Sequence, residues 1–376
     1  MVNFDRNWGT QSQRQHFLPK TYLKPWGRNI SSDGRHIRVY FIDKEESIQP
    51  EKESRYVRNT ATANEFIVPN FYSRNIRIPF QEEADLDFLL EPILKKNYSV
   101  FLDEKKLESK RDLTGLFHYY NEWEIYNPAG ILISSEEKNS LEEEILSKEI
   151  RNLEAAWDRM YENSWNRIRD EIIDLAYASK GQDIIQDKNR LELIEFMVSI
   201  DWRTVKGNEM FNNVFNGLFP KIEKCFDFEI DNDLPLEKRA YPFLDTEKEN
   251  YRHSVRLSLF HKFFNKTGAM YQYAQEIKDT MVIELLIPED GAEFITSDNP
   301  IEFHKNIHEK IDYIFPISPK LACAVRKNTK MEYNNFYILT EITKEEVYAY
   351  NKQIKESASK GYIVQELDQE KYFGAE

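Results

Sequence analysis

The segment FITSDNPIEF, at residues 294–303, holds the acidic residue best placed to take part in chemistry. An apolar run stops at a Ser-Asp-Asn-Pro turn and then resumes, a pattern that puts a polar cluster at the rim of a sheet. At a strand end, the carboxylate of Asp298 could ligate a metal, act as a general base or accept a hydrogen bond from a ligand. The alternative is structural, because Asp and Asn side chains bond nearby backbone amides and stabilise turns. Asp298 is the first candidate for a functional residue.

His16 and Arg203 are the other two candidates for catalysis. His16, in the segment HFLPKTYL, precedes a proline-containing turn that would hold its ring rigidly, and an imidazole titrates near neutral pH. The alternative to a catalytic role is that His16 is a core histidine whose ring makes a structural hydrogen bond. Arg203 follows an expected helix, where its guanidinium could clamp a phosphate or carboxylate, or simply cap the last helical carbonyls. In the catalytic interpretation Arg203 holds a phosphate, His16 transfers a proton, and Asp298 orients the histidine or binds a metal.

Two further pairs have spacings that are found in functional sites. His304 and His308 are four residues apart, as metal ligands on a helix would be, but they lie between strand-like runs. Arg256 and His261 form an R-x4-H pattern on a helical stretch, which arises easily by chance. No metal ligand is therefore assigned, and the cofactor is left open, with a divalent metal as one candidate.

The expected secondary structure around these residues changes twice along the chain, from strands to helices and back to strands. The N-terminal part predicts strands at residues 37–42 and 65–68. The middle shows helical spacing of apolar residues at 84–94, 140–180 (as one helix or two), 189–202 and 251–277. The C-terminal part predicts strands, followed by a helix that Thr343 caps and a last strand at 362–364. The expected C-terminal strands span residues 281–288, 293–297, 313–315, 321–325 and 336–339.

This order predicts an α+β fold, with a mixed or antiparallel sheet built from the N- and C-terminal segments and a large helical middle. The expected divisions are a β-containing segment at 1–80, a helical region at 81–280, and a β-rich segment with a final helix at 281–376. Segments 1–80 and 281–376 are expected to share one sheet-bearing unit.

Composition excludes several classes of protein. The chain has 376 residues and a formal net charge of −14, which disfavours a general binder of nucleic-acid backbones. Its two cysteines, Cys225 and Cys323, sit in apolar contexts without a CxxC partner, so a reducing compartment is expected. There is no signal-peptide pattern at the N-terminus and no apolar run of about 18 residues. A cytoplasmic protein without a membrane partner is expected.

Several short motifs together resemble the prokaryotic domain-of-unknown-function family 4238 (DUF4238). His16-Phe17-Leu18-Pro19 with Tyr22-Leu23 is similar to the family's H-x-x-P-x-x-Y-L opening, and residues 294–300 are similar to its F-I-T-S-D-N-P. Further similarities lie in Trp202-Arg203-Thr204, in the F-P-x-S-P segment from Phe315, and in Asn351 with Tyr362-Ile363-Val364. One departure is Val205, where the family usually has proline.

The resemblance covers nearly the whole chain and implies a set of site residues without an activity. It implies that His16, Arg203, Asp298 and Asn351 converge although they are far apart in sequence. The residues expected to bind a ligand around them are Tyr22, Ser297, Asn299, Lys320 and Asn351.

Two classes of function follow from these observations. The first is an enzyme acting on phosphate-containing substrates, such as a phosphodiesterase or nuclease-type effector of a bacterial defence or toxin system. The acidic net charge favours a small site or a nucleotide ligand over a large RNA or DNA footprint. The second is a non-catalytic sensor module that binds a small ligand or a protein. A third possibility is that the motifs are purely structural and fix the junction between the sheet and the helices. Whether the chain is an enzyme, and its oligomeric state, stay open at this point.

Overall fold

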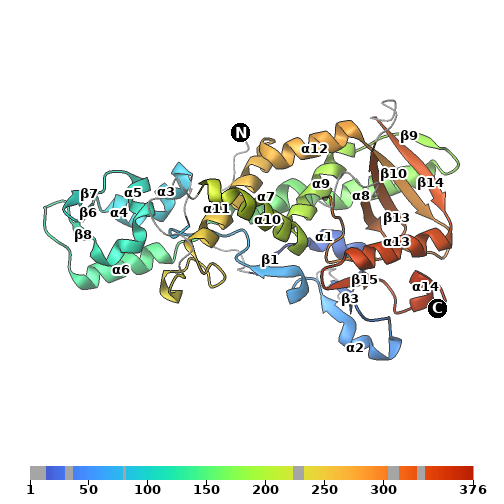
Figure 1. Cartoon of the computed structure of the whole chain (residues 1–376), viewed down its shortest axis with the longest axis horizontal. Coiled ribbons are helices and arrows are strands. Elements are labelled where there is room, and N and C mark those ends of the chain that lie inside the picture. Colours follow the sequence, from blue (N-terminus) through green and yellow to red (C-terminus); the bar gives the residue numbers. More distant parts are fainter. Residues whose placement is uncertain are drawn as a thin grey trace. The chain divides into compact units, whose positions relative to one another are not determined.

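The computed structural model describes residues 14–29, 37–78, 82–222, 233–303, 313–327 and 335–375, which fall into two units. Among these residues, unit 1 comprises Asn70–Ala156 and Val214–Asn265. Unit 2 comprises Arg14–Pro69, Trp157–Asn213 and Lys266–Glu376. Figure 1 shows the elements of both units along the chain. All of the candidate catalytic and ligand-binding residues belong to unit 2.

The larger sheet of unit 2 is centred on β10 (Met281–Pro288), which is buried over nearly its whole length. β10 pairs antiparallel with β13 (Leu321–Lys327) and parallel with β14 (Phe336–Ile342). The outer strands are β12 (Tyr313–Ser318) and β9 (Ile184–Gln186). A strand covered on both faces reads as a continuous apolar run, which explains the MVIELLIP sequence of β10.

A second sheet of unit 2 joins the two ends of the chain, as expected from the sequence. β15 (Gly361–Val364) pairs antiparallel with β3 (Ile37–Asp43), so that Tyr362 lies opposite Ile42. The remaining strands are β11 (Thr296–Ser297), β2 (Arg28–Asn29) and β4 (Val57–Asn59). β1 (Arg14–His16) and β5 (Ile67–Pro69) form a separate antiparallel pair. The N- and C-terminal strands therefore share a sheet that is distinct from the one around β10.

Helices surround these sheets, and α8 and α12 pack against β10 (Figure 1). α13 begins at a capping box in which the Thr343 side chain accepts from the amide of Glu346, as the sequence predicts. α10 (Val205–Ile222) begins in unit 2 and ends in unit 1. The other helices of unit 2 are α1 (Lys20–Leu23), α2 (Glu53–Tyr56), α8 (Asn163–Ala178), α9 (Arg190–Arg203), α12 (Gly268–Thr280), α13 (Lys344–Ser357) and α14 (Gln369–Phe373).

Unit 1 carries a small antiparallel sheet and its own aromatic core. The sheet has the order β7-β6-β8, from Lys105–Lys106, Ser99–Leu102 and Glu124–Tyr126. Trp123 and Phe117 pack in this core against apolar residues of the neighbouring helices. The helices are α3 (Glu83–Leu89), α4 (Glu91–Lys95), α5 (Lys110–Gly115), α6 (Ser135–Leu146) and α11 (Glu247–Phe264).

The helical stretch expected at 140–180 is interrupted between residues 147 and 151. α6 ends at Leu146, and Ile150 then exchanges backbone hydrogen bonds of 2.8 and 3.1 Å with Arg74. The chain resumes as α7 (Asn152–Trp157), a π-helical turn (Asp158–Glu162) and α8. A pairing with a residue far away in sequence causes this break, and local apolar spacing cannot reveal it.

The stretch expected to be helical at 251–277 is likewise two helices, α11 and α12. Lys266, between the two helices, and Gly268, the first residue of α12, have φ angles of 57° and 77°. A left-handed backbone ends a right-handed helix, which is why glycine and turns are common at such positions.

The α+β class expected from the sequence is confirmed by these sheets and helices. Over the described ranges, no helix combines the length and the apolar character needed to cross a bilayer. Cys323 is a buried free thiol, whereas Cys225 lies outside the described residues.

Gly207 allows α10 to begin directly after α9. A Cβ atom on Gly207 would lie 1.8 Å from the carbonyl oxygen of Asp201, whereas a Cβ atom on Gly217 of the same helix would meet nothing within 4 Å. We expect Gly207→Ala to lower the free energy of unfolding by about 2–3 kcal/mol, because the backbone must move to relieve the overlap.

The matched control is Gly217→Ala, which should raise stability by about 0.5–1 kcal/mol because alanine loses less entropy in a helix. Urea unfolding of both variants measures the difference. Equal stability of the two variants would show that the contact of Gly207 with α9 does not constrain the fold.

Candidate functional site

His16 and Arg203, which are 187 residues apart in sequence, meet in unit 2. Arg203 is the last residue of α9, and its Nη2 donates a hydrogen bond of 2.7 Å to the backbone carbonyl of His16 at the end of β1. The same nitrogen donates to a carboxylate oxygen of Glu162 at 2.9 Å. Only 2% of Arg203 is exposed, so these contacts fix the position of β1 against the end of α9.

The π-helical turn Asp158–Glu162 supplies the surroundings of the Arg203 guanidinium. Trp157, immediately before the turn, presents its ring 4.8 Å from the guanidinium carbon, which is a cation–π contact. Glu162, at its end, supplies the carboxylate that compensates the buried charge. π-helical turns of this kind occur often at functional sites. Neither residue stands out in the sequence as part of a site, because helical spacing alone does not show where the extra residue of a π turn lies.

The ring of His16 is half-buried and surrounded by positive charge. Its Nε2 lies 3.0 Å from the carbonyl oxygen of Thr60, to which a neutral ring donates. Burial, together with the charges of Lys20, Arg203 and Arg14, lowers the pKa of His16 to about 4. At neutral pH the ring is therefore uncharged, and in the tautomer that donates to Thr60 its Nδ1 is the acceptor.

Asp298 is held by the backbone at the start of β15. Its Oδ1 and Oδ2 accept hydrogen bonds of 2.8 Å each from the amides of Ser359 and Lys360, and its own amide donates to the carbonyl of Gly361 at 3.2 Å. Burial raises the pKa of Asp298, while these backbone amides oppose the shift. The carboxylate thus braces the junction of β11 and β15, and it belongs to a different group of contacts from the pair of His16 and Arg203.

Tyr22 and Asn351 are buried in unit 2 and bond to the segments that carry the other motifs. The Tyr22 hydroxyl donates to the carbonyl of Pro316 at 3.0 Å and lies 2.6 Å from Oγ1 of Thr296. Asn351 accepts from the amide of Ile295 at 3.0 Å and donates to two backbone carbonyls at 2.9 Å. The motifs around residues 22, 296, 316 and 351 therefore converge, through polar groups that are used to join backbone segments.

The other expected ligand-binding residues lie close to these. Ser297 Oγ accepts from the amide of Asn299 at 3.2 Å, and the Asn299 side chain donates to the carbonyl of Ser357 at 3.1 Å. Asn299 Oδ1 is buried and has no hydrogen-bond partner among the described residues. Lys320 is exposed, and its backbone carbonyl accepts from the Tyr177 hydroxyl at 2.9 Å.

A second contact connects the segment after Arg203 with the segment after Asp298. Lys206, in the first turn of α10, forms an ion pair of 2.7 Å with Glu302, which is nearly buried. This ion pair joins the segment that follows Arg203 to the segment that follows Asp298, and it does so through Lys206 and Glu302. Neither residue was identified from the sequence, where both read as ordinary surface charges.

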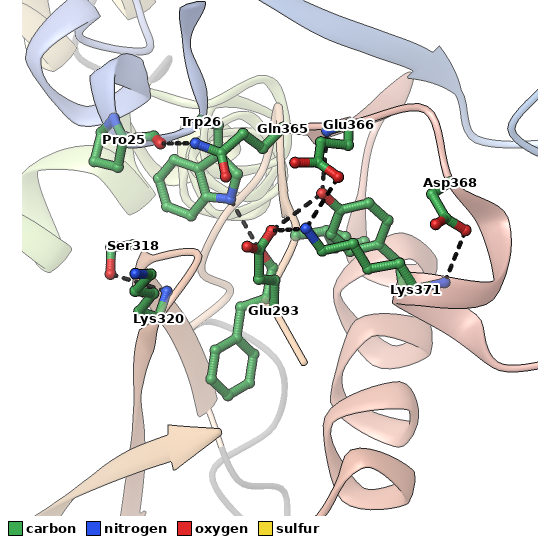
Figure 2. A network of polar contacts seen from close by, with 12 residues as sticks. Pro25, Trp26, Glu293, Ser318, Lys320, Gln365, Glu366, Asp368 and Lys371 are labelled. Atoms are coloured by element: carbon green, nitrogen blue, oxygen red, sulfur yellow. Dashed lines mark hydrogen bonds and ion pairs between the residues drawn. The ribbon is translucent and has the colours of Figure 1, made fainter. Parts of the chain in front are cut away.

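The N-terminal motif is also fixed to the C-terminal elements, as Figure 2 shows. Trp26 Nε1 donates to the carbonyl of Phe294 at 2.9 Å, and Gln365 donates to the carbonyl of Pro25 at 3.4 Å (Figure 2). Nearby, Lys371 forms ion pairs with Glu293 at 3.0 Å and with Glu366 at 3.2 Å. The segment that carries His16 is thereby fixed at both of its ends.

The geometry supports neither a metal site nor a functional pair formed by Arg256 and His261. Within the described ranges, no cluster of three or more His, Cys, Asp or Glu side chains is arranged to hold a metal ion. His304 and His308 lie outside the described residues. Arg256 and His261 lie on α11 of unit 1, where five residues correspond to about 140° of helical rotation, so they face different directions.

Asp298→Asn tests the role of this carboxylate as a brace. The amide nitrogen of asparagine would face a backbone N–H at the site of one carboxylate oxygen, which leaves a buried donor without an acceptor. We expect a loss of about 2–3 kcal/mol in the free energy of unfolding by urea. The control Asp290→Asn, at an exposed position, should change stability by less than about 0.5 kcal/mol. Wild-type stability of Asp298→Asn would contradict the structural role.

A comparison with protein families covers all of the segments that carry these motifs. The family model described as a protein of unknown function, DUF4238, matches residues 14–366. Neither the curated proteins nor the solved structures contain a match to the chain. The match extends over His16, Arg203, Asp298 and Asn351 and over both units, and the chain therefore belongs to the DUF4238 family.

Proposed function

We propose that unit 2 binds a phosphate-bearing ligand beside His16 and acts as a phosphodiesterase of the nuclease type. The observation that carries this proposal is a neutral, half-buried imidazole among the positive charges of Arg14, Lys20 and Arg203. An anion placed there gains mainly from Lys20 and Arg14, since Glu162 compensates the charge of Arg203, while the imidazole supplies an acceptor for a proton. Phosphate is the anionic group that such a combination of cations and an acceptor suits best.

The same charges explain how ligand binding and proton transfer would be coupled. A base whose pKa is about 4 is weak at neutral pH, since general bases work best when their pKa lies near the working pH. A bound phosphate would offset the repulsion from Lys20, Arg203 and Arg14 and would raise the pKa of His16, while burial, the largest cause of the lowered pKa, would continue to lower it. The imidazole is therefore a stronger base when the anionic ligand is present.

The roles of the other residues follow from their contacts. Arg203 is a positioning residue, because its guanidinium holds the carbonyl of His16 and the carboxylate of Glu162. Asp298 supports the fold at β15, where its two oxygens accept from backbone amides, and it has no part in the proposed chemistry. Lys20 is exposed at the start of α1 and is the cation best able to reach a ligand.

A small ligand suits this site better than a long nucleic acid. The formal net charge of −14 opposes the approach of a polyanion over a wide surface, whereas a nucleotide needs only a local cluster of cations. We therefore place nucleotides and short oligonucleotides before duplex DNA or structured RNA as substrates.

A non-catalytic sensor that binds the same anion is the second candidate. Glu162 already balances the charge of Arg203, and both oxygens of Asp298 accept backbone hydrogen bonds. Because Arg203 and Asp298 are engaged in these structural contacts, His16 is the sole candidate for chemistry among the three residues of the proposed catalytic group. Binding without turnover requires only the cations.

His16→Gln tests the Nδ1 acceptor of the ring separately from the hydrogen bond that the ring makes to Thr60. Glutamine can still donate to the carbonyl of Thr60, but it lacks the Nδ1 acceptor and does not titrate. Because the pKa of folded His16 is about 4 and the ordinary value is 6.5, wild-type stability is lost as the pH falls from 6.5 towards 4.

The expected result is that the wild type loses more free energy of unfolding than His16→Gln across this pH range. Urea unfolding at a series of pH values measures it, and carboxylates that titrate in both proteins cancel in the difference. Parallel curves for the two proteins would contradict the lowered pKa of His16.

Lys20→Gln tests anion binding, with Lys24→Gln as its matched control one turn further along the chain. Both lysines are exposed, but Lys20 is among the charges that act on His16. We expect Lys20→Gln to weaken binding of nucleoside monophosphates, measured by calorimetry, by about 3–10-fold, and Lys24→Gln to leave it unchanged.

Turnover then distinguishes the two candidate functions. If the chain is an enzyme, it hydrolyses a bis-(p-nitrophenyl) phosphate or dinucleotide probe, and His16→Gln abolishes the reaction while it still binds the nucleotide. Binding that Lys20→Gln weakens, without hydrolysis by the wild type, favours the sensor. An absence of both binding and hydrolysis would refute the anion site.

A further inference from the structure

Unit 1 presents two adjacent apolar side chains to solvent on a rigid loop. Ile131 and Leu132, between β8 and α6, are 63% and 55% exposed. The next residue, Ile133, turns inward and packs against the core of unit 1. Exposed apolar side chains that occur singly are ordinary on a protein surface, but an adjacent pair at the tip of an ordered loop favours a contact with another molecule.

The side chain of Asn127 fixes the shape of this loop. Its Oδ1 accepts hydrogen bonds from the amides of Ala129 at 3.0 Å and Ile131 at 3.1 Å. The backbone of Asn127 closes the loop by donating to the carbonyl of Ile131 at 2.9 Å, and Gly130 takes a φ of 76°. The two apolar side chains are thus held in place before any partner binds, which lowers the entropy lost on association.

Carboxylates flank the apolar pair on both sides. Glu122 and Glu124 precede the loop, and Glu136 and Glu137 lie in the first turn of α6; all four are exposed. Between residues 112 and 147 the chain has eight acidic residues and one lysine. The acidic residues are Asp112, Glu122, Glu124, Glu136, Glu137, Glu142, Glu143 and Glu144.

The single lysine of this stretch is turned away from the surface. Lys138 donates to the backbone carbonyls of Asn121 at 2.9 Å and Trp123 at 2.6 Å. Burial lowers the pKa of Lys138, and its ammonium group lies 5.6 Å from the ring of Tyr120. Lys138 interacts electrostatically with Glu142 and Glu124, but one lysine cannot balance eight carboxylates, so the net charge of this stretch is negative.

We infer that the loop of Ile131 and Leu132 is a docking surface for a basic segment of another protein that carries apolar side chains. Lysine or arginine would face the flanking carboxylates while an apolar side chain covers the pair. A second copy of the chain would bring carboxylates against carboxylates. Anionic lipid and nucleic acid would be repelled for the same reason. This surface is independent of the anion site proposed for unit 2.

The probe for this surface is a fluorescein-labelled synthetic peptide of alternating Lys and Leu, titrated with the full chain by fluorescence anisotropy. Two comparison peptides replace Lys by Glu or Leu by Ser. The test variant is Ile131→Ser with Leu132→Ser, and the control is Leu236→Ser, another exposed apolar position of unit 1. Circular dichroism melting of each variant checks that it is folded.

The double serine variant should weaken binding of the Lys/Leu peptide about tenfold or more, while Leu236→Ser leaves it unchanged. Glu124→Gln with Glu136→Gln should weaken binding several-fold and reduce its dependence on salt between about 0.05 and 0.5 M. Equal binding by the double serine variant would overturn the inference. So would binding to phosphatidylglycerol vesicles, or a dimer in analytical ultracentrifugation, that the same variant abolishes.

Discussion

The buried guanidinium of Arg203 is the constraint on which the geometry of unit 2 around His16 depends. A charge removed from water is costly unless good hydrogen bonds and an opposite charge surround it. Arg203 has a backbone carbonyl from β1, a carboxylate from the π-helical turn and the face of Trp157. These partners come from two parts of the chain, β1 and residues 157–162, so satisfying one charge fixes both of them against the end of α9. The position of His16 follows from this requirement, because its own carbonyl is one of the partners.

Burial and the neighbouring cations act in the same direction on the His16 ring. Both disfavour its protonated form and lower its pKa, and burial is the larger cause. In unit 2 the ring is half-buried and also close to Lys20, an exposed residue. The proton affinity of such a ring depends on the charge that lies beside it. That dependence is the physical reason for proposing an anionic ligand in this region.

Local sequence patterns were sufficient for elements that local physics determines. The apolar run of β10 and the capping box of α13 are examples, since burial on both faces and a Thr-x-x-Glu pattern are visible in the residues themselves. The break between α6 and α7 was not predictable in this way, because the backbone pairing of Ile150 with Arg74 causes it. The π-helical turn escaped detection because the surrounding contacts determine which residue is extra.

The candidate site was predictable only in part, and for a similar reason. The resemblance to the family indicated that distant motifs meet, and the contacts of His16 with Arg203 and of Tyr22 with Thr296 show two of these meetings. Glu162 read as one more solvated charge of a helix. One feature of the sequence could have indicated buried charged groups. α9 is apolar on nearly every side, so a helix of this kind is buried all round and its charged residues Glu195, Asp201 and Arg203 are buried with it.

The motif residues divide into two classes by how their polar groups are used. Asp298, Asn351 and Tyr22 bond to backbone amides and carbonyls within the protein, and they join strands to a helix or to each other. Lys20 is exposed, and its charge acts on the ring of His16. The first class fixes the architecture of unit 2, whereas the proposed ligand site depends on the second class.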